Sequence, residues 1–326
     1  MLGGTVFLSR AVAVEAAARG HDVSVAARGA SGSVPDGVRH VALDRTEEIP
    51  EELAAEEFDA VVDVARTPSW VARAVAAWPR AHWTFVSTIN VYADETTPGG
   101  TPATLPLVDA QPEDIDLRAH PEAYGPMKVA CEQLVHDGAE RAFVVRPGLI
   151  VGPGDPTGRF TYWPARLADV EPGEPGEPVL AGGDPSDTVQ VIDVRDLAAW
   201  IVTAAESGLT GDLDGVGPSM PLGDLLAEVA TGLGVEPRWT WASDAILEVH
   251  DVAPWMGPRS LPLWLPRPAY DGMLAHDWSP SRDAGLTARP IGETARDTLE
   301  WLRATPDAVV TGLTREQERE VLHGLG

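Results

Sequence analysis

The sequence has 326 residues and a mass of 34.6 kDa, which is enough for one large domain or two fused ones with a sizeable core. Its 50 acidic and 24 basic residues give a formal charge of −26, which disfavours both nucleic acids and acidic membrane surfaces as partners. The single cysteine excludes an internal disulfide, and because no signal peptide or long apolar run is visible, we expect a cytoplasmic protein without a membrane span.

Strands and helices alternate in the first half of the chain. Apolar, β-rich runs predict strands at Asp22–Ala27, Val38–Leu43, Asp59–Ala65, His82–Ser87 and Ala142–Arg146. Helical patterns lie between them at Phe7–Arg19, closed by Gly20, at Ser69–Trp78, with Ser69 as the N-cap, and at Tyr124–His136. Such alternation indicates a parallel sheet covered by helices on both faces. We therefore predict an α/β fold with a doubly wound, Rossmann-type domain over residues 1–150.

The strand that should open this pattern is missing, because the chain begins inside the turn that normally follows it. That strand would be central in the sheet. We therefore expect a start assigned too late, with a GTG valine codon read as the initiator Met1. Intact-mass analysis of the native protein would test this expectation.

Residues 151–326 are predicted to form a smaller, mostly helical lobe on the substrate side. Within it, a strand from Thr188 and a helix at Val194–Glu206 are expected to return to the first domain, over residues 188–207. Later helices are predicted at Leu222–Leu233, near Ile291–Ala304 and after Thr314, which is spaced from Gln317 as in a capping box.

Two long irregular segments interrupt the pattern, at Ala93–Pro121 and Ala168–Pro185. The second contains a Glu-Pro-Gly repeat at Glu171–Pro178. Long loops inside compact domains are usually either functional lids or solvated spacers, and both interpretations stay open here.

Tyr124 and Lys128 carry the clearest chemical signal. They are four residues apart on a predicted helix, so their side chains share one face. A nearby ammonium would lower the pKa of the phenol and make Tyr124 a usable acid or base near neutral pH. Lys128 is the only lysine of the chain, and Tyr124 is one of four tyrosines. The pair therefore predicts a catalytic tyrosine rather than an accidental spacing.

Ser87 and Thr88 end a predicted strand of the parallel sheet. Ligands bind at the carboxyl ends of such strands, so these hydroxyls could bond a substrate oxygen. The alternative is that they cap the strand end and bond the backbone.

Together these residues resemble the short-chain dehydrogenase/reductase superfamily, and most closely its extended branch, the NAD-dependent epimerase/dehydratase family. The segments that carry the resemblance are Gly3-Gly4-Thr5-Val6-Phe7-Leu8, Ser87-Thr88 with Val91-Tyr92, Tyr124-Gly125 with Lys128 and Glu132, Arg146-Pro147, and Val194-Arg195-Asp196-Leu197. The resemblance implies that Thr88 orients a carbonyl or carbinol, that Tyr124 moves the proton, and that Lys128 holds the nicotinamide ribose. It also implies cofactor contacts from Gly3, Gly4, Thr5, Phe7, Leu8, Asp44, Ala65, Tyr124, Lys128 and Pro147. A homodimer is a further implication of the resemblance.

The sequence departs from the family pattern in its glycine-rich turn. The family has Gly-x-x-Gly-x-x-Gly, whereas this chain has Gly3, Val6 and Ser9. A β-branched Val6 could crowd a diphosphate, and Ser9 adds bulk where the helix meets the sheet. After the second strand, Arg28 stands near the place where NAD-specific relatives have an acid, so we expect NADP with Arg28 against its 2′-phosphate and keep NAD as the alternative. The other interpretation of Arg28 is a solvated surface arginine.

Two further departures narrow the reaction. Dehydratases of this family have an acid just after the strand-end threonine, where this chain has Ile89 and Asn90. Nucleotide-sugar enzymes tend to have an asparagine at the position of Leu149, which cannot hydrogen-bond a substrate. Dehydration and a nucleotide-sugar substrate are therefore both disfavoured.

The run from Asp155 to Trp163 has no assigned role. Its Tyr162 and Trp163 could line an apolar substrate pocket or belong to the interlobe core. All eight histidines are taken as structural, and no metal-binding constellation is apparent.

We therefore predict an NAD(P)-dependent oxidoreductase acting on a carbonyl or secondary alcohol of a small molecule. An NAD(P)-dependent epimerase or isomerase with a retained cofactor is the alternative within enzymes. A non-catalytic dinucleotide-sensing or scaffold protein is the alternative of another class.

Overall fold

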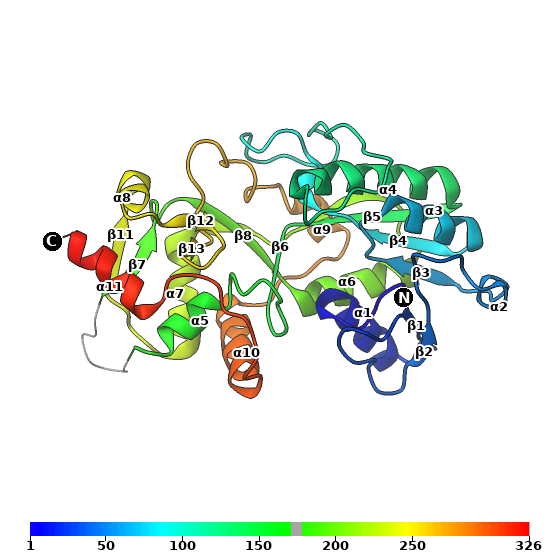
Figure 1. Cartoon of the computed structure of the whole chain (residues 1–326), viewed down its shortest axis with the longest axis horizontal. Coiled ribbons are helices and arrows are strands. Elements are labelled where there is room, and N and C mark those ends of the chain that lie inside the picture. Colours follow the sequence, from blue (N-terminus) through cyan, green and yellow to red (C-terminus); the bar gives the residue numbers. More distant parts are fainter. Residues whose placement is uncertain (171–177, 326) are drawn as a thin grey trace.

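The central sheet is parallel and runs through the right-hand half of the molecule in Figure 1. A computed structural model describes residues 1–170 and 178–325. Within these residues the strands of the sheet follow the order β2, β1, β3, β4, β5, β9. Their bounds are β1 (Ser24–Ala27), β2 (Arg39–Ala42), β3 (Ala60–Asp63), β4 (His82–Val86), β5 (Arg141–Pro147) and β9 (Gly211–Gly215).

Strand β1 and strand β3 are connected through a single residue, Leu2. It forms parallel bridges to Ala26 on one side and Asp63 on the other, and it occupies the place of the expected first strand. The Leu2 amide donates to the Val62 carbonyl at 2.9 Å. Leu2 thus joins the β1–β2 pair to the four strands β3, β4, β5 and β9.

Helices cover both faces of the sheet, as predicted (Figure 1). Helices α1 (Phe7–Ala18) and α6 (Val194–Ser207) pack together on one face, and α3 (Pro68–Ala77) and α4 (Tyr124–Gly138) pack together on the other. The strands are apolar because both of their faces are covered. Trp83 and Phe85 of β4, for example, are completely buried.

The remaining elements of this part are short. They are α2 (Glu51–Ala54) and two 3-10 turns, η1 (Ile89–Val91) and η2 (Pro121–Ala123). The predicted N-cap of α3 is wrong: the helix begins at Pro68 after Thr67, because proline fits the first helical position, and the Ser69 hydroxyl instead contacts Asp114 at 2.6 Å.

The C-terminal part contains the helices predicted at Leu222–Leu233, near Ile291–Ala304 and after Thr314, and the strand predicted from Thr188, whereas its other short helices and strands were not predicted. The helices are α5 (Tyr162–Leu167), α7 (Leu222–Leu233), α8 (Asp244–Val249), α9 (Ser279–Asp283), α10 (Ile291–Ala304) and α11 (Arg315–Gly324). The strands are β6 (Leu149–Val151), β7 (Val179–Gly182), β8 (Thr188–Asp193), β10 (Ser219–Pro221), β11 (Trp239–Ala242), β12 (Ala253–Trp255) and β13 (Ser260–Pro262). They pair as β6–β8–β10, β7–β11 and β12–β13.

The capping box at the start of α11 is confirmed, with Thr314 and Gln317 bonding each other's backbone. Tyr162 and Trp163 belong to the hydrophobic core of this part, where both are at most 2% exposed, so they do not line an open pocket. Helix α6 returns to the sheet beside α1, while a domain boundary at residue 150 stays a prediction. The Glu-Pro-Gly repeat falls on residues 171–177, outside the described residues.

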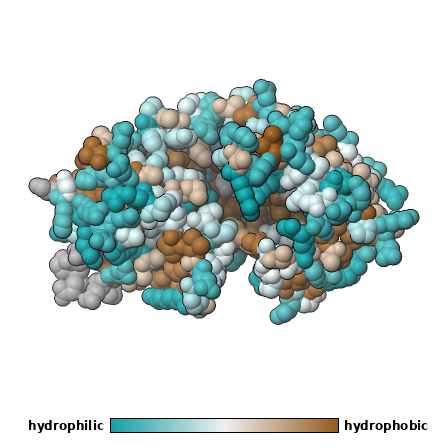
Figure 2. Space-filling model, viewed as in Figure 1, coloured by the Kyte–Doolittle hydropathy of each residue, from teal (hydrophilic) through white to brown (hydrophobic). Residues whose placement is uncertain are grey.

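Of the helices in the described part, not one has both the length and the apolar character needed to cross a membrane. The space-filling view in Figure 2 shows a hollow with an apolar floor between the two parts of the molecule.

Candidate functional site

Thr88 and Tyr124 meet at the carboxyl end of the parallel sheet. Thr88 directly follows β4 and caps η1: its hydroxyl accepts the Asn90 amide at 3.2 Å and donates to Oδ1 of Asn90 at 2.9 Å. Tyr124 begins α4, directly after η2. Burial raises the pKa of the Tyr124 phenol, and the nearby Thr88 side chain acts in the opposite direction as a smaller effect. Thr88 therefore caps the turn after β4 and faces the tyrosine, while a bond from its hydroxyl to a substrate oxygen stays a prediction.

The expected electrostatics of Tyr124 need correction. Burial is the largest influence on its phenol and raises the pKa above the ordinary value, because desolvation disfavours the phenolate. The cation that opposes this effect is Arg66, not Lys128. Arg66 was not predicted, and its only signal was its position in the loop after β3, at the same edge of the sheet.

Lys128 lies under the site rather than beside the phenol. Its ammonium donates to the Ala65 carbonyl at 2.7 Å and to the Val86 carbonyl, so it links the ends of β3 and β4. It also lies 4.4 Å from the centre of the Phe85 ring. The side chain is 2% exposed, and burial lowers its pKa to about 8. A compact ammonium fits this narrow position, which a planar guanidinium would not.

The Lys128 charge should make stability depend on pH. The folded-state pKa of about 8 lies below the ordinary value of 10.5, so between these pH values only the unfolded state holds the proton, and stability rises with pH. We expect the free energy of unfolding of the wild type to rise by about 3 kcal/mol relative to Lys128→Met across this range. Urea unfolding of both proteins at stepped pH measures the difference. Parallel curves for the two proteins would contradict the prediction.

The glycine-rich turn keeps its shape despite its departures from the family pattern. Gly3 and Gly4 have φ values of +99° and +101°, and a Cβ on Gly4 would lie 2.6 Å from Val25. Ser9 fits at 7% exposure, because its hydroxyl donates to the Val6 carbonyl at 2.8 Å and Gly3 leaves room for it. The predicted obstruction by Ser9 at the helix–sheet contact therefore does not arise.

The start of α1 offers free backbone donors. The helix has no side-chain cap, and from Gly4 to Ser9 no backbone N–H has a hydrogen-bond partner among the described residues. Such N–H groups at a helix N-terminus bind anions, including the diphosphate of a dinucleotide. Thr5 and Leu8 are buried in the turn, whereas Val6 is 44% exposed beside these donors. Phe7 has a φ of +41° and packs toward Gly154. The turn therefore fits a dinucleotide, with Val6 at its open side.

Arg28 and Asp44 lie at the adenosine end of this predicted site. Both are exposed, and Arg28 is one of the groups that hold the pKa of Asp44 low, after the hydrogen bonds from Thr46. Arg28 acts on Asp44 through its charge, and no ion pair joins the two side chains among the described residues. Pro147 ends β5 at the same edge of the sheet.

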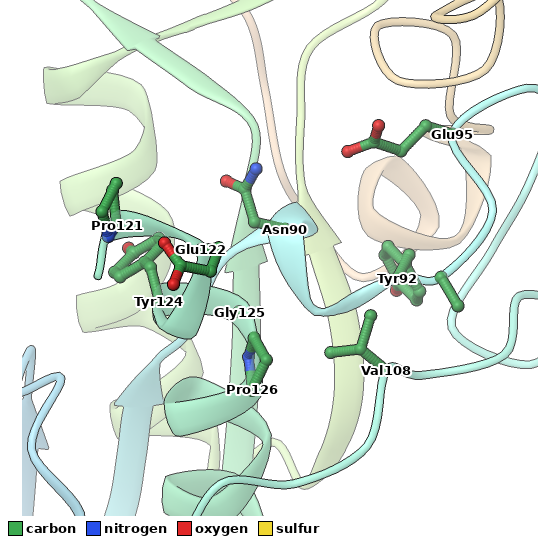
Figure 3. A pocket seen from close by; sticks show the side chains of 10 residues that line it. Asn90, Tyr92, Glu95, Val108, Pro121, Glu122, Tyr124, Gly125 and Pro126 are labelled. Carbon is green, nitrogen blue, oxygen red and sulfur yellow. The ribbon is translucent and has the colours of Figure 1, made fainter. Parts of the chain in front are cut away.

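A pocket of about 360 Å³ lies beside Tyr124 (Figure 3). Asn90 and Tyr92 line it from the strand end, and Glu122 lines it from η2. Glu95 lines it from the long loop after β4, and burial raises the pKa of its carboxyl. This carboxyl was not predicted, because a loop residue gives no periodic signal. Tyr124 thus lies next to a polar pocket.

Arg146 anchors a buried ionic network below the site. Its guanidinium donates to Glu132 at 3.0 and 2.7 Å, to Asp212 at 3.0 Å and to the Tyr92 hydroxyl at 3.2 Å. The Tyr92 hydroxyl in turn donates to Asp214 at 2.7 Å. The network ties β5, β9, α4 and the pocket wall together.

His276 completes this network from the C-terminal part. Its Nδ1 lies 2.9 Å from an Asp214 carboxylate oxygen, and both side chains are at most 3% exposed. The carboxylate partner is therefore distant in sequence and is not the neighbouring Asp277. This buried contact agrees with a structural role for the histidine.

Comparisons with known proteins identify relatives of the whole fold. The family model described as NAD dependent epimerase/dehydratase family matches residues 1–214. Among solved structures, WbmH of Bordetella bronchiseptica in complex with NAD+ has 16% identity and a TM-score of 0.64, over 93% of this chain and 96% of that one. A UDP-glucose 4-epimerase has 14% identity and a TM-score of 0.64, over 94% and 98%. TunA, an NAD dependent NDP-hexosamine 5,6-dehydratase involved in tunicamycin biosynthesis, has 18% identity and a TM-score of 0.61, over 93% and 97%. No curated protein matches the sequence.

Proposed function

Because this chain belongs to the NAD dependent epimerase/dehydratase family, we propose that it is an oxidoreductase that interconverts a carbonyl and a secondary alcohol on a small molecule. The observation that carries the proposal is the meeting of Thr88 and Tyr124 at the carboxyl end of the sheet, one helical turn from the buried Lys128.

The protein side chains have distinct roles in this proposal. Tyr124 donates a proton to the substrate oxygen during reduction and takes it back during oxidation, which its half-buried phenol can do only when the substrate lies against it. Thr88 holds the same oxygen through its hydroxyl. Lys128 fixes the strand ends that carry Thr88 and Ala65, and Arg66 stabilises the phenolate.

The residues present fit a nicotinamide dinucleotide. The free N–H groups at the start of α1 would hold its diphosphate, and Tyr124 and Lys128 would hold the nicotinamide ribose. When bound, this cofactor supplies or accepts the hydride. We propose NADP, with NAD as the alternative, because Arg28 is exposed at the adenosine end, where its guanidinium can reach a 2′-phosphate.

The substrate carbonyl is proposed to belong to a molecule other than a nucleotide sugar. Leu149 is 3% exposed and packs in the core, so it offers a nucleotide sugar no hydrogen bond. Ile89 is also buried, and neither it nor Asn90 supplies the acid of a dehydratase. These positions support simple oxidation and reduction.

Equilibrium titration with NADPH and NADH, followed by fluorescence, tests the cofactor part of the proposal. We expect micromolar binding of NADPH, with about 10-fold or greater weakening in Arg28→Ala, because a guanidinium–phosphate contact is lost. NADH binding should change little in the same variant. Arg10→Ala, which removes another exposed arginine near the turn, serves as the matched control.

The outcomes of this titration separate the alternatives. Equal weakening of NADPH and NADH in Arg28→Ala would contradict NADP selection. Cofactor that stays bound through purification and does not exchange would favour an epimerase that re-reduces its own intermediate. Absence of binding by either nucleotide would favour a scaffold protein. Screening of carbonyl compounds by NADPH oxidation then tests turnover itself.

A further inference from the structure

Arg159 is a half-buried cation without a carboxylate partner. Among the described residues, the other buried or half-buried arginines each contact a carboxylate, except Arg73, which donates to the Arg45 carbonyl. The Nε of Arg159 donates to the Thr157 hydroxyl at 3.2 Å, while both terminal nitrogens have no hydrogen-bond partner among the same residues. These two nitrogens are not among the buried side-chain atoms that lack a partner, so they are open to a ligand from outside the folded chain.

The nearest carboxylate, Asp155, is already engaged. It is 1% exposed, and its oxygens accept the Thr157 amide at 2.8 Å and the Thr157 hydroxyl at 2.7 and 3.0 Å. Asp155 therefore orients Thr157, and Thr157 orients Arg159. These hydrogen bonds orient the Arg159 guanidinium although it forms no ion pair with Asp155.

Trp255 supplies a flat surface against this guanidinium. The centre of the guanidinium lies 4.5 Å from the centre of the indole ring. Trp255 has a φ of +69°, in the left-handed region that a bulky residue rarely adopts. Backbone strain of this kind persists where the surrounding structure enforces it, and it concentrates at ligand-binding positions. The half-buried guanidinium of Arg159 therefore lies against a residue whose backbone is strained.

The surroundings of this pair are apolar and adjoin the dinucleotide turn. Met256 is 51% exposed next to Trp255, and Val309 is 60% exposed next to the Gly158 turn. Gly154, in the same loop as Arg159, lies against Phe7 of the glycine-rich turn. The loop that carries Arg159 therefore runs from the predicted cofactor site to an apolar surface.

We propose that Arg159 and Trp255 form a subsite for an oxyanion, a carboxylate or a phosphate, attached to an apolar or aromatic body. The two free guanidinium nitrogens match the two oxygens of such a group, and the indole and Met256 cover the attached apolar part. This assigns the substrate of the proposed oxidoreductase to anionic carbonyl compounds. That this ligand is the substrate rests on the proposed function. Binding of the ligand at Arg159 does not, because binding requires no turnover.

Calorimetric titration with three probes tests the subsite in the protein without cofactor. The probes are 4-acetylbenzoate, phenyl phosphate and acetophenone, which has the same ketone as the first without its charge. We expect at least one of the two anions to bind about 10-fold or more tightly than acetophenone, because a charge-assisted bidentate contact distinguishes them. Arg159→Gln should abolish this preference, and Arg159→Lys should restore only part of it. Whichever anion binds more tightly identifies the source of the oxyanion.

Arg282→Gln is the matched control. Arg282 also lies over an indole, 5.7 Å from the centre of the Trp278 ring, but it already has a carboxylate partner in Asp283 at 2.9 Å. This variant should keep the full anion preference. Equal binding of charged and neutral probes, lack of binding by both anions, or an unchanged preference in Arg159→Gln would each overturn the proposal.

The calorimetric readout is separate from the NADPH titration, so failure of the subsite and failure of the proposed function are distinguishable.

Discussion

Replacing Tyr124 by phenylalanine should lower kcat by about 10²- to 10⁴-fold, the range that general acid–base groups contribute. The change removes one hydroxyl from a helix whose packing uses the apolar residues Met127, Val129 and Val135, so folding should be unaffected. Steady-state reduction of the carbonyl substrate found in the NADPH screen measures the effect. The dissociation constant for NADPH should rise far less than kcat falls, since Tyr124 would supply one ribose contact beside the several free donors at the start of α1.

Tyr270→Phe is the matched control for this prediction. It makes the same chemical change at a half-buried position in the C-terminal part. The control variant should retain wild-type turnover. If both variants had comparable turnover, the prediction would be wrong, because Tyr124 would then not be the group that transfers the proton.

Replacing Arg146 by methionine should destabilise the protein by about 3–5 kcal/mol, the usual cost of leaving a buried carboxylate without its partner. The guanidinium is 3% exposed, and its removal leaves Glu132, at 2% exposure, without its cation, while Asp212 keeps His136 at 3.0 Å. The Tyr92 hydroxyl also loses a hydrogen bond. Urea unfolding followed by circular dichroism measures the free energy of unfolding of this variant.

Two further variants define what the Arg146 result means. Arg80→Met removes an exposed pair, with side chains 76% and 89% exposed, and should cost about 0–1 kcal/mol. The double variant Arg146→Met, Glu132→Leu should recover part of the lost free energy of unfolding, because the Glu132 carboxylate is then no longer buried without a cation. An Arg146→Met variant as stable as Arg80→Met would show that the network contributes little to stability.

The fold was largely predictable because its signals are local. Strands such as β4 are continuous apolar runs, and α6, α7 and α10 carry regular apolar faces. The pairing of β7 with β11 was not predictable, because it joins Val179–Gly182 to Trp239–Ala242 across a long separation and each run is only four residues long. Short strands of this kind form only when the rest of the chain brings them together.

The proximity of the proposed site residues was predictable, but their electrostatics were not. Thr88, Tyr124 and Lys128 follow from a strand end and one helix face, so their proximity can be inferred from spacing. The pKa of Tyr124 depends on burial and on Arg66, which lies on another strand end, and neither quantity is encoded in local pattern. The spacing rule also placed Lys128 beside the phenol, whereas its long side chain reaches the carbonyls below it.

The burial of Lys128 gives the chain an unusual labelling chemistry. It has the only side-chain amine in the sequence, so acylating reagents such as N-hydroxysuccinimide esters have a single side-chain target, at the base of the candidate site. The pKa of about 8 means that a large share of this amine is neutral and nucleophilic in mildly alkaline buffer, while burial limits access to it. The acylation rate at Lys128, read by peptide mass spectrometry, therefore reports how often this site opens. A ligand that covers the strand ends should slow that rate.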